Sequence, residues 1–159
     1  MPGEGTSMTT IHFYHEADPY GAFSNSAPYP VELGGTTWPT SEHYFQAAKL
    51  VGPDHQAEIL KARTPGLAAR IGRDPARPVR ADWEAVKDDI MLAVVRAKFT
   101  QHEDLRTLLL GTGNAELIEH TYKDSYWGDG GDGTGKNMLG KTLMQVRDEL
   151  RGAASGKQA

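Results

Sequence analysis

Residues 29–50 read YPVELGGTTWPTSEHYFQAAKL and contain both kinds of element from which the fold is built. In the first half, apolar and polar residues alternate on either side of Gly34-Gly35, a pattern typical of a β-hairpin with a tight turn. After the proline that follows, Thr40 or Ser41 can cap a helix that continues to the end of the stretch. The segment therefore predicts a hairpin that leads directly into a helix.

Outward from this stretch, the chain predicts more helix than strand. Strand composition occurs in TTIHFYH (9–15) and AELIEHT (115–121). Helical patterns occupy 55–63, 66–72, a segment after Asp82 that we expect to be the longest helix, 103–113, and about Asn137 to Leu150. This order predicts an α+β fold, a helix-rich single domain with a small antiparallel sheet. We expect that domain to span residues 10–151, with a disordered N-terminus at 1–9 and a flexible tail at 152–159.

The composition is that of an ordinary globular chain, with 159 residues, 38% of them hydrophobic, and a net charge of −4 at pH 7. That charge argues against a protein that coats DNA. The absence of cysteine excludes disulfides, thiolate zinc sites and a cysteine nucleophile. The first ten residues lack the pattern of a signal peptide, and no apolar run approaches the roughly 18 residues of a membrane span. We therefore expect a soluble cytoplasmic protein with no membrane partner.

The stretch WGDGGDGTGKN at 127–137 nearly matches the nucleotide-binding P-loop. Asn137 stands where that motif needs a hydroxyl for Mg²⁺, and the preceding HTYKDSYW is not a hydrophobic strand. Gly131 stands where an EF-hand needs an Asp or Asn ligand. Two interpretations remain open: a surface turn, or a loop that faces a ligand. In the second, Trp127 stacks on a flat ring and free N–H groups of the helix that Gly135 and Asn137 open attract an anion.

Glu42, Gln46 and Lys49 lie at helical spacing on one polar face of the helix predicted after Thr40. A solvated face and a catalytic face both fit this pattern. His43 has no second histidine or carboxylate at zinc-ligand spacing, so we expect no metal. The segment KARTPGLAARIGRDPARPVR (61–80) concentrates arginine in an acidic protein. It is either a solvated surface or a source of forked donors for phosphate, with Arg73 the favoured donor.

Seven blocks of the sequence together resemble the NADAR family, and within it the bacterial N-glycosidases of riboflavin-biosynthesis intermediates. The resemblance covers nearly the whole chain from Ile11 to Leu150. The blocks are FSN at 23–25, WPTSEHYFQAAK at 38–49, GRD at 72–74, Trp83, RAKF at 96–99, WGDG at 127–130 and GKNMLG at 135–140.

The resemblance implies an enzyme of helix-rich fold, without metal or other cofactor, that hydrolyses the C1–N bond of a phosphorylated N-riboside. It also implies that Glu42, Trp83 and Asp129 belong to the active site. We expect Glu42, Asp129 and Lys49 to be catalytic. We expect the substrate to be bound by Phe23, Ser24, Asn25, Arg73, Trp83, Trp127, Gly128 and Asn137.

The chemistry leaves two routes and several substrates open. Glu42 and Asp129 can act as a pair of carboxyl groups, or Lys49 can attack C1 of the opened ribose and form a Schiff base. The expected substrates are ribosylaminopyrimidine 5′-phosphates, cleaved to ribose 5-phosphate and the free pyrimidine. The alternatives are removal of ADP-ribose from guanine in DNA or other nucleic acid, and a non-catalytic module that binds ADP-ribose or a derivative of NAD.

Overall fold

The computed structural model describes residues 9–158, with side chains as far as Ala154. The chain forms two compact units: a terminal unit made of Met1–Ser24 with Glu103–Ala159, and a central unit, Asn25–His102. Apart from Thr9, the predicted disordered N-terminus lies outside the described residues. No helix in the described part of the chain is both long and apolar enough to cross a membrane.

The central unit begins with the predicted hairpin and helix. Strands β2 (Val31–Leu33) and β3 (Thr36–Trp38) pair antiparallel, and the two glycines between them have φ of 65° and 82°, as a tight hairpin turn requires. Helix α2 (Ser41–Lys49) follows, and the Thr40 hydroxyl accepts a hydrogen bond of 3.2 Å from the His43 N–H. The structure confirms the hairpin, the helix and its Thr40 cap.

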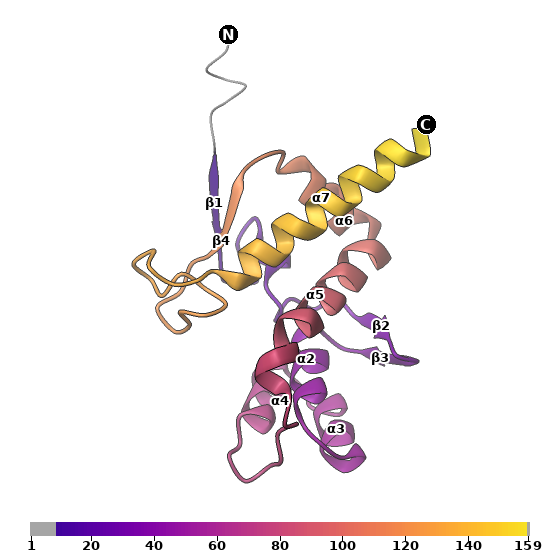
Figure 1. The fold of residues 1–159 in the computed structure, drawn as a ribbon, viewed down its shortest axis with the longest axis vertical. Coiled ribbons are helices and arrows are strands. Elements are labelled where there is room, and N and C mark those ends of the chain that lie inside the picture. Colours follow the sequence, from indigo (N-terminus) through magenta and orange to yellow (C-terminus); the bar gives the residue numbers. More distant parts are fainter. Residues whose placement is uncertain (1–8, 159) are drawn as a thin grey trace. The chain divides into compact units, whose positions relative to one another are not determined.

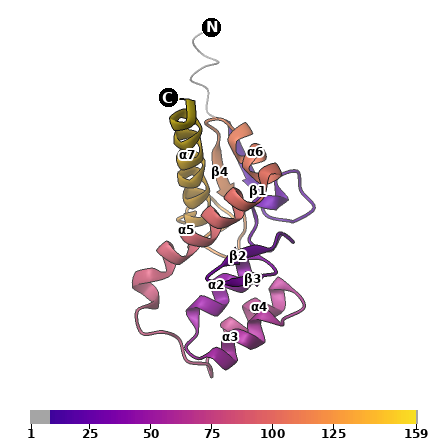
Figure 2. The ribbon, with the colours of Figure 1, turned by 90° about the vertical axis from the view of Figure 1, so that its right-hand side faces the viewer.

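Three more helices complete the central unit: α3 (Pro53–Leu60), α4 (Pro65–Gly72) and α5 (Trp83–Gln101). Figure 2 shows α2, α3 and α4 gathered together, and α2 contacts both α3 and α4. Their shared core is apolar and buried, and it consists of Trp38, Ala47, Leu50, Ile59, Ala62, Ala68 and Ile71.

Gly72 is the residue that allows α4 to approach α2 closely. A Cβ at this position would stand 2.0 Å from Oε1 of Gln46 on α2, and 2.9 Å from its Cβ. Only a residue without a side chain fits there without moving Gln46.

The terminal unit contains β1 (Thr10–Phe13), the short 3₁₀ helix η1 (Gly21–Phe23), α6 (Glu103–Gly111), β4 (Glu116–Glu119) and α7 (Met138–Gln158). In Figure 1, β1 and β4 lie side by side, and α7 packs against β4 and α6. β1 and β4 pair parallel, with Ile11 opposite Leu117. The structure confirms the helix-rich α+β class, but this parallel pair adds a second small sheet that local sequence patterns did not predict.

The final helix departs from the prediction in length. α7 has 21 residues and continues through Gln158, beyond the predicted end at Leu150 and into the segment expected to be a flexible tail. α5 has 19 residues, so the expectation that it would be the longest helix is wrong.

Asn137 joins the start of α7 to the free edge of β4. Its Oδ1 accepts a 3.0 Å hydrogen bond from the Glu119 N–H, and its Nδ2 donates one of 2.9 Å to the Leu117 carbonyl. The side chain thus pairs with β4 as a neighbouring strand would. Asn137 also has a φ of 53°, which asparagine tolerates better than most residues. Gly140 completes the arrangement, because a Cβ there would stand 2.0 Å from the Leu117 carbonyl oxygen.

We predict that Asn137→Ala lowers the free energy of unfolding by roughly 2–4 kcal/mol, because it removes two hydrogen bonds and leaves backbone groups of β4 unpaired. Urea denaturation followed by circular dichroism measures the change. Asn114→Ala is the control, since Asn114 is exposed and its side chain accepts only a 3.4 Å bond from Arg151. A loss of under about 0.5 kcal/mol in Asn137→Ala would show that β4 does not depend on this side chain.

Candidate active site

The polar face of α2 carries the candidate acid, Glu42. Its Oε2 accepts a 2.8 Å hydrogen bond from Nε2 of Gln46, one turn further along the helix. Gln46 is itself 3% exposed, and its Oε1 is buried with no hydrogen-bond partner among the described residues. Because Gln46 is packed beneath α4 at Gly72, the carboxylate of Glu42 is held by a side chain that has little freedom to move.

Asn25 fixes the beginning of α2. Its Oδ1 accepts a hydrogen bond of 2.8 Å from the Ser41 hydroxyl, and its backbone carbonyl accepts one of 3.1 Å from the Glu42 N–H. Its Nδ2 donates to Sδ of Met91, on α5, at 3.4 Å. These contacts orient the turn that carries Glu42. Contact between Asn25 and substrate stays a prediction.

Lys49, at the end of α2, has an altered acidity. Partial burial lowers the pKa of its ammonium group, and the positive charge of Arg73 lowers it further, whereas Glu42 and Glu84 oppose the shift. The first two effects prevail, so the neutral amine is present at lower pH than for an ordinary lysine. Glu42 and Arg73 therefore both act electrostatically on Lys49 within the central unit.

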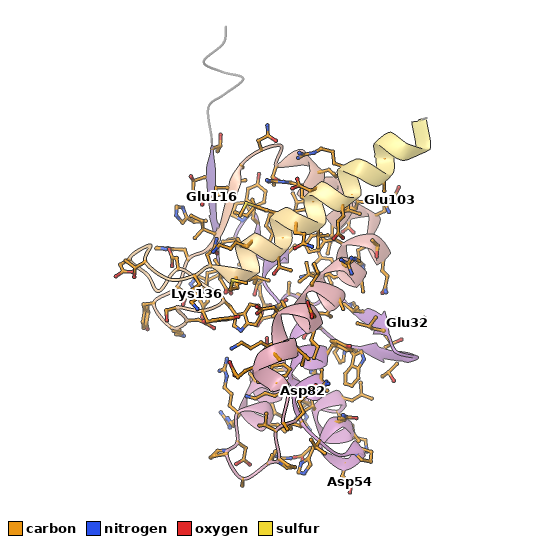
Figure 3. The ribbon with its side chains drawn as sticks, in the orientation of Figure 1. Glu32, Asp54, Asp82, Glu103, Glu116 and Lys136 are labelled. Atoms are coloured by element: carbon orange, nitrogen blue, oxygen red, sulfur yellow. The ribbon has the colours of Figure 1, made fainter. Side chains whose placement is uncertain are left out.

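The arginine-rich segment divides into paired and unpaired members. Arg77 forms ion pairs with Glu58 at 2.5 Å and Asp74 at 3.3 Å, and Arg80 pairs with Asp82, the residue labelled in Figure 3 at the start of α5. Arg77 and Arg80 are therefore engaged in ion pairs within the central unit.

Lys61, Arg70 and Arg73 have no ion-pair partner among the described residues. They line a hollow of about 970 Å³ whose walls also include apolar Leu67 and Ile71. An open hollow with unpaired cations and an apolar wall can accept an anion attached to a flat or apolar group.

Trp83 and Lys98 both belong to α5. Trp83 is 8% exposed at the first position of the helix, with its ring 5.0 Å from that of Phe45 on α2. Lys98 was not predicted as a site residue. It is 1% exposed, and burial lowers the pKa of its ammonium group to about 7. In the sequence, Lys98 lies within the RAKF block at 96–99, but helical periodicity could not show that its side chain points into the interior.

His43 is a core residue. Its two ring nitrogens lie 2.8 Å from the Thr40 hydroxyl and 3.0 Å from the Ala62 carbonyl, and it is 1% exposed. These partners occupy both nitrogens.

In the terminal unit, Asp129 organises the Gly-rich loop between β4 and α7. Its Oδ1 accepts hydrogen bonds from the N–H groups of Thr121 at 3.0 Å and Gly131 at 2.9 Å. Its Oδ2 lies 2.7 Å from Nδ1 of His120. Burial raises the pKa of Asp129, but the hydrogen bonds from His120, Gly131 and Thr121 outweigh burial and hold this pKa below its usual range. The carboxylate therefore stays ionised.

The start of α7 does not offer the free N–H groups that the sequence predicted. The loop folds back on the helix, so that its carbonyl groups accept these hydrogens at 2.8–3.0 Å. The donors are the N–H groups of Lys136, Asn137, Met138 and Leu139, and the acceptors are the carbonyls of Ser125, Gly128, Tyr126 and Trp127 respectively. The expectation of an anion site at these groups is wrong. Figure 3 marks Lys136 on this loop.

The remaining predicted residues have structural contacts of their own. Phe23 is 1% exposed with its ring 5.7 Å from that of Phe13, and Ser24 is 6% exposed. Trp127 is partly buried, with its ring 5.0 Å from that of Tyr126. A Cβ at Gly128 would stand 2.8 Å from the Asp124 carbonyl oxygen. Their contact with substrate stays a prediction.

Comparison with known proteins gives one consistent result. A family model described as the NADAR domain matches residues 12–151. The chain is 53% identical over 142 residues to the N-glycosidase YbiA of Escherichia coli, covering 89% of each chain. It is 43% identical to a riboflavin biosynthesis protein of Vibrio vulnificus, covering 89% of this chain and 38% of that protein.

A solved structure agrees with the sequence comparison. The NMR structure of E. coli YbiA matches with a TM-score of 0.85 at 51% identity, over 92% of this chain and 87% of that one.

We predict that Arg73→Ala raises the pKa of Lys49, because it removes a cation that disfavours the ammonium form. At a fixed pH the neutral fraction of Lys49 then falls, so acetylation of Lys49 by acetic anhydride should become slower. Mass spectrometry of the peptide containing Lys49, across a pH series, follows the change. Arg70→Ala is the control, since Arg70 lines the same hollow but is not among the charges that act on Lys49. An unchanged pH dependence in Arg73→Ala would contradict the coupling.

Proposed function

The chain belongs to the NADAR family and is an N-glycosidase, a hydrolase of N-glycosyl bonds, and we propose that it acts on early riboflavin-biosynthesis intermediates. These substrates are ribosylaminopyrimidine 5′-phosphates, and the products are ribose 5-phosphate and the free pyrimidine. The name of the relative from V. vulnificus supports this choice of substrate, because it is a riboflavin biosynthesis protein.

The observation that carries the proposal is the charged face of α2. Breaking a C1–N bond requires a proton for the departing group or the ring oxygen, because an amine leaves poorly and the sugar develops positive charge. Glu42 supplies a carboxyl group held by Gln46, and Lys49 supplies an amine with a lowered pKa. A helix face that only contacts solvent would need neither a carboxyl group held in place nor an amine with a lowered pKa.

We assign phosphate binding to Arg73. It has no acidic partner among the described residues, and its guanidinium can fork two hydrogen bonds to a phosphate group. It also acts electrostatically on Lys49, and this supports a phosphate site close to the proposed nucleophile.

Lys49 favours the route through a Schiff base. A proton on the ring oxygen opens the ribose to an iminium at C1, and the neutral amine of Lys49 adds to this carbon. The ribosyl nitrogen then takes up the proton that Lys49 loses and departs with the electron pair of the C1–N bond, which leaves an imine on Lys49 that water hydrolyses to the free aldehyde and the amine. In the alternative route, Glu42 and Asp129 share the acid and base roles without a covalent intermediate.

A second candidate substrate is an ADP-ribosylated guanine in nucleic acid. The hollow of about 970 Å³ favours it, because unpaired Lys61 and Arg70 lie beside Arg73 and provide charge for a second phosphate. A riboside monophosphate needs no such extension. Purified protein supplied separately with both substrates distinguishes them by the product released, ribose 5-phosphate or ADP-ribose.

We predict that Glu42→Gln lowers kcat for release of ribose 5-phosphate by about 10²- to 10⁴-fold, as expected for loss of a general acid or base. The amide keeps the size of the side chain, so the melting temperature should change little. Glu84→Gln is the control, since Glu84 is exposed and also acts on Lys49 but lies outside α2. Activity of Glu42→Gln within about threefold of wild type would refute the catalytic assignment.

We predict that borohydride added during turnover traps a sugar adduct on Lys49. The adduct appears as a mass increase in the intact protein, and peptide mapping assigns it to Lys49 or to Lys98, whose pKa is also lowered. Lys49→Arg should be inactive and unlabelled, because a guanidinium stays protonated and cannot add to C1. Absence of any adduct together with substantial activity of Lys49→Arg would favour the two-carboxylate route, and an adduct on Lys98 would move the nucleophile there.

A further inference from the structure

Gln46 occupies a buried position between α2 and α4, next to the candidate acid. It is 3% exposed, and its Nε2 donates a 2.8 Å hydrogen bond to Oε2 of Glu42. Its Oε1 is buried with no hydrogen-bond partner among the described residues. A Cβ at Gly72 would stand 2.0 Å from this oxygen. The amide group therefore faces Glu42 at one end and the backbone of α4 at the other.

The unpaired oxygen of Gln46 requires an explanation. A buried acceptor without a partner is costly, and native proteins contain few of them. Packing alone does not account for a glutamine here, because the flexible apolar side chain of methionine could fill the space between the helices without leaving an oxygen unpaired. The hydrogen bond that Gln46 gains in return is the one to Glu42. This points to a role of the amide toward Glu42 rather than toward the contact between the helices.

A general acid such as the one assigned to Glu42 is protonated before it acts and ionised afterwards. The two forms need different partners, because a carboxylate only accepts hydrogen bonds, whereas a carboxylic acid also donates one. With Nε2 directed at Oε2, the amide of Gln46 suits the carboxylate. A proton on Oε2 would meet an N–H donor instead. A primary amide can suit both forms, since it carries a donor and an acceptor on the same carbon.

We propose that Gln46 is a positioning residue that serves Glu42 in both of its protonation states. In the ionised state Nε2 donates to the carboxylate, as in the structure. In the neutral state the amide makes a half-turn about its last side-chain bond, and Oε1 accepts the O–H of Glu42. The torsion at this bond is broad and roughly two-fold, and Oε1 has no partner to give up among the described residues. The inference rests on the proposed role of Glu42 as the acid of the N-glycosidase reaction.

The proton balance of this step involves Glu42 alone. Neutral Glu42 gives its proton to the ribosyl group of the substrate, and the carboxylate regains a proton from solvent water before the next turnover. Gln46 neither gains nor loses a proton, because only the orientation of its amide changes. Oε2 of Glu42 thus keeps a partner, and with it its position, while its charge changes.

The titration of Glu42 tests this contact directly and needs no substrate. In protein labelled with ¹³C at the side-chain carboxyl of glutamate, the Glu42 signal is assigned by its absence in Glu42→Gln and followed against pH. Gln46→Met removes a donor that stabilises the ionised form, so the midpoint should rise by about one pH unit. Gln46→Glu places a second carboxyl beside the first, so the midpoint should rise further. Gln56→Met is the control and should leave it unchanged, since Gln56 donates to the Leu50 carbonyl at 3.2 Å.

Turnover of the same variants tests the consequence for the reaction. At saturating substrate, we expect kcat of Gln46→Met for release of ribose 5-phosphate to fall by about 10- to 100-fold while KM stays within about threefold. Gln56→Met should keep the wild-type rate. A wild type that releases no ribose 5-phosphate, with the Glu42 midpoints shifted as expected, would contradict the proposed substrate and support the contact.

Two results would overturn the proposal. The first is a folded Gln46→Met in which Glu42 titrates at the wild-type midpoint. The second is a shifted midpoint together with a wild-type kcat, which would show that the contact does not serve the reaction. If Gln46→Met does not fold, Gln46→Glu decides by the same midpoint, because it keeps the size of the side chain.

Discussion

The hydrogen bonds that converge on Asp129 determine the shape of the Gly-rich loop. The side chain accepts from Thr121, Gly131 and His120, and the backbone of the same residue donates to the Glu119 carbonyl and accepts from the Gly135 N–H. A buried carboxylate is expensive unless it is well paired, and here the donors are sufficient to keep its pKa low. The loop resembles a P-loop in composition, yet its carbonyl groups face the helix start, so it cannot hold a phosphate with those N–H groups.

The central unit depends on a comparable constraint between two helices. Gly72 lets α4 approach α2, the approach buries Gln46, and Gln46 donates to Glu42. The position of the carboxylate is thus set by packing rather than by solvent. The same approach brings the residue after Gly72, Arg73, near enough to lower the pKa of Lys49. Gly72 therefore influences both the carboxylate of Glu42 and the amine of Lys49.

Local sequence patterns predicted most of the helices and strands. The features that these patterns missed depend on contacts between segments far apart in the chain. The hairpin turn, the Thr40 cap and most helices follow from patterns within ten or so residues, and the structure confirms them. The parallel pairing of β1 with β4 joins segments that are separated by the whole central unit, so no local pattern could indicate it. The acceptors that occupy the start of α7 lie in the preceding loop, and only its folded path reveals them. Glu42 and Lys49 were recognisable on one helix face, whereas the contact between His120 and Asp129 becomes visible only in the folded chain.

Lys49 and Lys98 both have a lowered pKa, but an amine nucleophile needs access to the substrate as well. Burial alone lowers the pKa of Lys98 to about 7, but a side chain in a residue that is 1% exposed cannot reach a sugar without movement of its surroundings. Lys49 is only partly buried, and the charge of Arg73 adds to the effect of burial. A charge that also binds phosphate would change this balance on substrate binding, since an anion on Arg73 screens its effect and returns the pKa of Lys49 toward the ordinary value. Phosphate recognition and amine reactivity would then oppose each other at Lys49, so the Schiff-base route requires burial to maintain the neutral amine once substrate is bound.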